Sequence, residues 1–325
     1  MSARTGETDA AALSAERFLQ YLKTAMGARI TDALADDYVT EVMCNPDGCV
    51  WIDHVETGRT NTGIQLSASS AQTVIRLVAD FVREPTTAAS PRLQAVLPSG
   101  ERFQGVLPPC APRPAFTIRK PAKTRWTLAD YVERGILQPK QRDVIVQAVE
   151  DRQNIGIVGG TGTGKTTLAN AILGVPAFSE DRVVVIEELP ELNCPAPDRV
   201  NLFTKRTDPP VTMSDLVRDS LRLRPERIVI GECRGPEALD MLKAWNTGHP
   251  GGLTTFHANS NEEALERVEE MIGEVAQSIP KATIARALNV LVFLSRRKID
   301  GAYVRRVETV SRVVGHSPYR FEHIA

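Results

Sequence analysis

Apolar positions in the first 120 residues follow helical and alternating spacings that predict a mixed domain. Phe18, Leu22 and Met26 recur at helical spacing and, with a similar run over 71–82, predict two amphipathic helices. Short apolar segments bounded by turn residues predict strands over 41–44, 49–53, 93–97, 102–107 and 115–118. This order of elements predicts a small α+β domain over 13–119. Residues 1–12, which are small and polar, are expected to be disordered.

Beyond the first domain, short apolar runs alternate with helical segments. Residues 120–127 contain a proline and several basic side chains and are predicted to be a linker. Apolar runs without polar alternation are typical of strands that are buried on both faces. Such runs occupy 154–158, 183–186, 200–203, 228–230 and 253–256. Because helices separate them, they predict a largely parallel, wound α/β sheet within a second domain over 128–325.

A glycine-rich loop follows the first of these buried strands. It fits the pattern Gly, four residues, Gly-Lys-Ser/Thr, and a helix is predicted from Lys165 onward. Backbone N–H groups of such a loop wrap nucleotide phosphates, its lysine reaches the β and γ phosphates, and its hydroxyl ligates Mg²⁺. The residues assigned to nucleotide binding are Gly159, Gly160, Thr161, Gly162, Thr163, Gly164, Lys165, Thr166 and Thr167. The sequence therefore predicts a nucleoside triphosphate site.

Acidic residues and a histidine follow three other buried strands. Glu187, Glu188 and Glu191 come after one strand, Glu232 after the next, and His257 after a third. The carboxyl ends of parallel strands meet at the edge that carries the phosphate loop. A carboxylate there can activate water or support Mg²⁺, and a histidine can contact the γ phosphate. A solvated glutamate or a structural histidine is the alternative in each case, and spacing alone does not choose among the three glutamates.

Basic residues supply two further candidates. Arg102 and Arg119 lie in the first domain, and Arg119 directly precedes the linker, from where it can reach a nucleotide between domains. The stretch 296–320 holds seven basic residues against Asp300 and Glu308. This stretch is either a solvated strand face or a binding patch.

Overall composition bounds the class of protein without selecting a function. The chain has 325 residues, 42% of them apolar and 24% charged, and a net charge of −1, which gives no general attraction to nucleic acid or membranes. Its five cysteines form no C-x-x-C pair, which favours a reducing cytoplasm. No signal peptide and no apolar run of membrane-spanning length is present, so any membrane association is expected to be peripheral.

Four motifs in a fixed order resemble those of the type II/type IV secretion ATPases. They correspond to the Walker A, Asp box, Walker B and His box of that family and lie at 159–167, 186–192, 221–235 and 255–259. Segments 100–109 and 116–120 of the first domain are also similar to that family, so the resemblance spans roughly residues 90–300. The short N-terminal region and the form of the loop look most like the conjugal-transfer (TrbB-like) branch.

The resemblance implies a PAS-like N-terminal domain, a RecA-like P-loop ATPase domain and ATP with Mg²⁺ held between them. It also implies a homohexameric ring that is cytoplasmic and peripheral at the inner membrane. There it would dock on secretion-channel components and coupling ATPases, and power pilus biogenesis or the transfer of DNA–protein substrates. Ring formation rests on the resemblance alone.

Residue roles carry over by position. Lys165 and Thr166 match the residues that bind phosphate and Mg²⁺, and Glu232 matches the Walker B acid, which assists the metal directly or through water. Glu191 matches the Asp-box general base, and His257 matches the His-box residue. The family arginines that approach the nucleotide from the N-terminal domain correspond to Arg119 and Arg102. Glu188 stands where the family usually has Asp, which makes it a weaker candidate base than Glu191.

Other functional classes remain open at this point. A RecA-like nucleic-acid translocase or helicase is supported by the basic C-terminal stretch, and direct nucleic-acid binding is undecided. A type II secretion or type IV pilus ATPase shares the same motifs. A kinase lacks support, because no acceptor-binding signature is present, and a scaffold that merely holds ATP would show no product.

Overall fold

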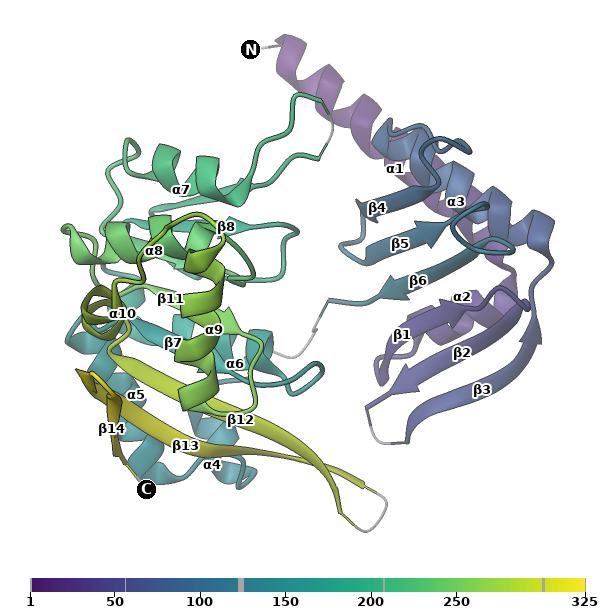
Figure 1. The fold of residues 1–325 in the computed structure, drawn as a ribbon. Helices are drawn as coiled ribbons and strands as arrows, with labels where there is room; N and C mark the ends of the chain where they lie inside the picture. Colours follow the sequence, from purple (N-terminus) through teal and green to yellow (C-terminus); the bar gives the residue numbers. More distant parts are fainter. Residues whose placement is uncertain (1, 56, 122–125, 207, 300–301, 325) are drawn as a thin grey trace. The chain divides into compact units, whose positions relative to one another are not determined.

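The computed structural model describes residues 2–55, 57–121, 126–206, 208–299 and 302–324 (Figure 1). The chain divides into two compact units, Met1–Lys123 and Thr124–Ala325, each with a hydrophobic core of its own. Residues 122–125 of the predicted linker lie outside the described residues. Among the described residues, no helix combines the length and the apolar character needed to cross a bilayer.

The first unit is a six-stranded antiparallel sheet covered by helices. Its strand order is β3-β2-β1-β6-β5-β4. The elements are α1 (Ser2–Met26), α2 (Ala28–Ala35), β1 (Val39–Cys44), β2 (Cys49–His54), β3 (Gly58–Gln65), α3 (Ala68–Val82), β4 (Arg92–Val96), β5 (Arg102–Val106) and β6 (Ala115–Arg119). Helices α1 and α3 pack together, with the rings of Phe18 and Phe81 stacked 4.3 Å apart between centroids. The predicted α+β arrangement is therefore confirmed.

Helix α1 and strand β3 of the first unit differ from the sequence prediction, and helix α2 was not predicted. Helix α1 begins at Ser2 and so includes residues 2–12, which were expected to be disordered. The run of three alanines over 10–12 explains the difference, because alanine has the highest helix propensity and continues the helix upstream of its apolar stripe. Strand β3 was not predicted, because it is a mostly exposed edge strand rich in polar residues.

The second unit is an eight-stranded sheet in the order β14-β13-β12-β7-β11-β10-β8-β9. Strands β12, β7, β11, β10, β8 and β9 are parallel, whereas β13 and β14 add antiparallel strands at one edge. The elements are α4 (Leu128–Glu133), α5 (Pro139–Glu150), β7 (Ile155–Val158), α6 (Lys165–Leu173), a 3₁₀ turn (Pro176–Phe178), β8 (Val183–Glu187), β9 (Arg199–Phe203), α7 (Met213–Ser220), β10 (Arg227–Ile230), α8 (Glu237–Asn246), β11 (Leu253–Phe256), α9 (Asn261–Gly273), α10 (Lys281–Ala287), β12 (Val290–Ile299), β13 (Ala302–His316) and β14 (Tyr319–His323).

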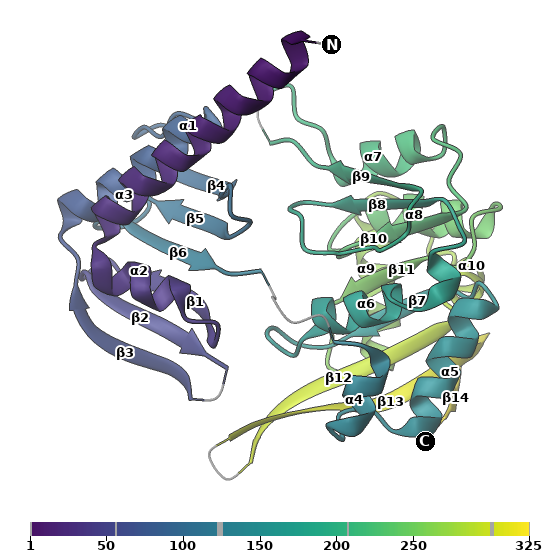
Figure 2. The ribbon, with the colours of Figure 1, turned by 180° about the vertical axis from the view of Figure 1, so that it is seen from behind.

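Helices cover both faces of this sheet, which is why its central strands read as unbroken apolar runs. Along β8, Val183 and Val185 join the core under α4, α5 and α6, whereas Val184 and Ile186 join the core under α7 to α10. Figure 1 shows α8 and α9 over one face, and Figure 2 shows α5 and α6 over the other. The predicted wound, largely parallel sheet is confirmed. The carboxyl ends of β7, β8, β10 and β11 consequently point to the same edge, where the predicted site residues follow them.

Candidate nucleotide-binding site

The phosphate loop joins β7 to α6 and has a backbone that requires glycine. Gly162 and Gly164 have φ angles of 72° and 102°, which side-chain-bearing residues rarely adopt. A Cβ atom on Gly159 would lie 2.5 Å from the Leu294 carbonyl oxygen and 2.8 Å from Thr163 Oγ1. The Thr163 hydroxyl closes the loop by donating to the Gly160 carbonyl at 3.0 Å. Thr161 also lies in the loop, and Thr166 and Thr167 begin the helix behind it.

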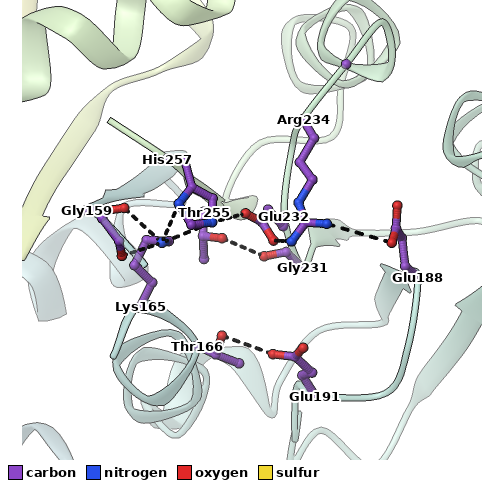
Figure 3. A network of polar contacts seen from close by, with 12 residues as sticks. Gly159, Lys165, Thr166, Glu188, Glu191, Gly231, Glu232, Arg234, Thr255 and His257 are labelled. Atoms are coloured by element: carbon purple, nitrogen blue, oxygen red, sulfur yellow. Dashed lines mark hydrogen bonds and ion pairs between the residues drawn. The ribbon is translucent and has the colours of Figure 1, made fainter. Parts of the chain in front are cut away.

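Lys165 lies at the centre of the site and is only 8% exposed. Its Nζ donates to the carbonyls of Gly159 and Gly160, at 2.8 and 3.0 Å, and lies 3.4 Å from the ring nitrogens of His257 (Figure 3). Burial lowers the pKa of Lys165 to about 8, with Glu232 opposing the shift and Arg234 adding to it. The ammonium is thus held by loop carbonyls at the position from which it can reach phosphate.

Glu232, His257 and Arg234 form a second group beside Lys165. His257 Nε2 lies 2.6 Å from Glu232 Oε1, and Arg234 donates to Glu232 Oε2. Burial and the charge of Lys165 lower the pKa of His257, with Glu232 opposing and Arg234 adding to the shift, so the imidazole is neutral near pH 7. The predicted meeting of the ends of β10 and β11 is therefore present, and Thr255 Oγ1 ties these strands together by donating to the Gly231 carbonyl at 3.0 Å.

Three glutamates, one at the end of β8 and two after it, have different surroundings. Glu187 is 3% exposed and accepts from the backbone N–H groups of Glu191 and Leu192, at 3.0 and 2.9 Å, so it shapes the loop. Glu191 Oε2 accepts from Thr166 Oγ1 at 3.2 Å (Figure 3). Glu188 instead lies 3.2 Å from Arg206 Nη2 and 3.9 Å from Arg234 Nη1. Of the three, Glu191 is the one whose carboxylate lies against the first turn of α6.

Oxygen donors at this edge of the sheet fit a magnesium ion. The hydroxyl of Thr166 and the carboxylates of Glu191 and Glu232 are hard oxygen donors of the kind Mg²⁺ prefers. The described part of the chain contains no cluster of three or more His, Cys, Asp or Glu side chains arranged to hold a metal. In nucleotide sites Mg²⁺ takes one or two protein ligands and completes its shell with phosphate oxygens and water.

Arg102 and Arg119 are cross-strand partners on β5 and β6 of the first unit. Arg119 Nε donates to the carboxylate of Glu41 on β1. Both arginines belong to the unit that does not contain the phosphate loop, so their approach to a nucleotide stays a prediction.

Two residues of the site were missed by the sequence analysis. Asn170, one turn after Thr166 on α6, donates to the Glu191 carbonyl at 3.2 Å and accepts from the Asn193 N–H at 2.7 Å, which fastens the β8 loop to the helix. The sequence could have indicated Asn170 through its spacing of four residues from Thr166, which places both side chains on one face of the helix. Arg296 Nη1 donates to the Gly162 carbonyl at 3.2 Å. The basic stretch 296–320, which begins within β12, indicated charge there but not which strand face would meet the loop.

The chain is similar to known secretion-system proteins along most of its length. The sequence model of the family described as "Type II/IV secretion system protein" matches residues 30–308. A conjugal transfer protein TrbB of Rhizobium radiobacter is 39% identical over 314 residues, which cover 95% of each chain. A type IV secretion system protein VirB11 of Brucella suis is 33% identical over 291 residues, 80% of each chain. The solved structure of the pilus retraction motor PilT with bound ADP has the same fold, with a TM-score of 0.60 at 17% identity over 87% of this chain and 80% of that one.

Proposed function

The chain belongs to the type II/IV secretion system protein family, and we propose that it is the ATP-hydrolysing motor of a bacterial conjugative type IV secretion system. In this role it would power pilus biogenesis or the transfer of DNA–protein substrates from the cytoplasmic side. The similarity to a conjugal transfer protein along nearly the whole chain supports this branch of the family. The glycine-rich loop with Lys165 and Thr166 supports a nucleoside triphosphate as the substrate.

The observation that carries the proposal is the gathering of Lys165, Thr166, Glu191, Glu232 and His257 at one edge of the sheet (Figure 3). Loop amides and the Lys165 ammonium bind the β and γ phosphates. Glu191 accepts a proton from the attacking water as general base. Thr166 and Glu232 would hold Mg²⁺, which would supply positive charge at the phosphate oxygens. His257, held neutral, donates its single N–H to Glu232 and so positions that carboxylate beside the γ phosphate.

The assembly we propose follows from family membership. Copies of the chain form a homohexameric ring in the cytoplasm, peripheral to the inner membrane and docked on secretion-channel components and coupling ATPases. Arg102 and Arg119 complete the nucleotide site from the first unit. Closure between the two units during ATP binding and hydrolysis would move substrate.

Phosphate release by the purified full-length chain tests the site. Lys165→Ala is expected to lower turnover at least about 100-fold, because the charge contact with the β and γ phosphates is lost. The matched control is Lys140→Ala, since Lys140 is an exposed lysine of α5; this variant should turn over normally. Turnover of Lys165→Ala at the wild-type rate contradicts the assigned site. Mass measurement with and without ATP and Mg²⁺ tests the ring, and a fully active monomer contradicts it.

Conjugation tests the biological role. A donor strain that lacks this chain is expected to transfer DNA only when complemented by the wild-type chain, and not by the Lys165→Ala variant. Normal conjugation without the chain would favour a type II secretion or pilus motor. Turnover that single-stranded DNA stimulates, through binding that weakens steeply with salt, would instead favour a nucleic-acid translocase.

A further inference from the structure

Strands β12 and β13 extend beyond the sheet as a two-stranded arm, which consists of residues 294–299 and 302–307 (Figures 1 and 2). Residues 290–293 of β12 pair with β7, whereas the residues beyond Phe293 pair with β13 alone in the described register. A bulge between Phe293 and Leu294 marks the point where the arm leaves the sheet. Bulges bend a strand and redirect its side chains, and they occur often beside active sites.

The alternation of side chains decides which part of the arm meets the phosphate loop. Leu294 and Val307 are paired across the two strands and are buried against the body of the second unit. Arg296 and Arg305, two residues farther along each strand, are also directly paired and therefore share that face. Arg297 lies on the opposite face, with its side chain 69% exposed and 3.1 Å from Glu308. The arm thus presents two arginines to the loop and others to solvent.

Arg296 is held in place at the loop by two contacts. Its Nη1 donates to the Gly162 carbonyl at 3.2 Å, and its Cζ lies 3.9 Å from the ring centroid of Tyr303. The side chain sits so close that a Cβ atom on Gly162 would be 2.7 Å from Nη1. Within the described residues, Arg296 forms no ion pair with a carboxylate.

The planar peptide between Gly162 and Thr163 links this contact to nucleotide binding. In a trans peptide the C=O and N–H groups point in opposite directions. Because Arg296 holds the Gly162 carbonyl, the Thr163 N–H faces away from the arm. N–H groups of this loop are the donors that wrap phosphate. We propose that Arg296, braced by Tyr303, is a positioning residue that fixes the Thr163 amide as a phosphate donor. This inference rests on the proposed nucleotide site.

Equilibrium binding of ADP to the full-length chain tests the inference, with steady-state ATP hydrolysis as a second measurement. Arg296→Gln is expected to raise the Kd for ADP about 10-fold, the size of effect expected when a charged hydrogen bond is lost. The KM for ATP should rise by a similar factor while kcat changes little, because the amide is positioned before chemistry begins. Arg296→Lys, which keeps the charge but loses the planar fork, should recover part of the affinity. Tyr303→Leu, which removes the brace alone, should weaken binding less than Arg296→Gln.

Arg297→Gln is the matched control, because it removes a neighbouring charge from the other face of the same strand and should leave the Kd unchanged. Wild-type affinity in Arg296→Gln overturns the inference while leaving the proposed function intact. Equal weakening in Arg296→Gln and Arg297→Gln also overturns it, since that result indicates a general charge effect. A wild-type chain that binds no ADP contradicts the proposed function itself. Thermal unfolding of each variant confirms that the fold is retained.

Discussion

Nucleotide affinity is expected to fall as the pH rises above about 8, because Lys165 loses its charge there. Burial among loop carbonyls and the neighbouring Arg234 lower the pKa of this lysine, and Glu232 only partly opposes them. Bound phosphate favours the ammonium form and therefore raises the pKa again. Below the pKa of the empty site, Lys165 is already charged and affinity is at its maximum. Above it, binding must first take up a proton, so affinity declines.

The magnitude follows from the pKa. With a value of about 8, Lys165 is about nine-tenths charged at pH 7 and about one-tenth charged at pH 9. The Kd for ADP should therefore rise about tenfold over this interval, which corresponds to about 1.4 kcal/mol. His257 does not complicate the interval, because its pKa is lowered from the ordinary value of 6.5, principally by burial.

Titration calorimetry of ADP binding without metal measures both quantities. Comparing two buffers of different ionisation enthalpy gives the protons taken up, which should be about 0.9 per site at pH 9 and about 0.1 at pH 7. Lys165→Met is the control, since any residual binding should lose this pH dependence. A Kd that stays constant between pH 7 and pH 9, without proton uptake, would refute the argument that burial depresses the pKa of this ammonium.

Three further predictions concern the base, the fold and the loop. Glu191→Gln should lower kcat about 10²–10⁴-fold with ADP binding retained, whereas Glu188→Gln should lower kcat less than about tenfold. If phosphate-release assays show the larger loss in Glu188→Gln, then Glu188 and not Glu191 is the general base. Asp181 is buried and accepts from Arg227 and Arg152, so Asp181→Asn should destabilise the second unit by about 3–5 kcal/mol in urea unfolding, against at most about 1 kcal/mol for the exposed Asp198→Asn. Gly164→Ala forces a side chain to a φ of 102° and should weaken ADP binding through about 1–3 kcal/mol of backbone strain, detectable by the same calorimetry; unchanged affinity would show that the loop relaxes.

The parts of the site that sequence predicts are those encoded by local pattern. The glycine loop, the helix from Lys165 and the positions of Glu232 and His257 at strand ends each depend on a few consecutive residues and on the rule that parallel strands end at one edge. The strongly apolar central strands were predictable for the same reason, because burial on both faces leaves no polar alternation.

The parts that sequence did not settle depend on contacts between distant segments. Glu187 and Glu191 look alike in the sequence, but Glu187 folds back onto the amide of Glu191, and only Glu191 reaches Thr166. Arg296 meets Gly162 through a pairing register and a bulge, neither of which composition reveals. Strand β3 escaped prediction because an edge strand with a solvated face carries too few apolar residues to be distinguished from a loop.

The six parallel strands of the second unit, close-packed on both sides, have a mechanical consequence. Strand β11 lies between β7 and β10, so the phosphate loop, Glu232 and His257 are anchored to three adjoining strands. Such an interior resists shear, because sliding one strand would break its ladder and open voids in two cores at once. A power stroke triggered at this edge therefore has to move the sheet and the helices packed on it as one rigid body. The flexible segments that convert ATP hydrolysis into movement must therefore lie outside this sheet and its helices. Hinge mutations in those segments should uncouple ATP consumption from transport.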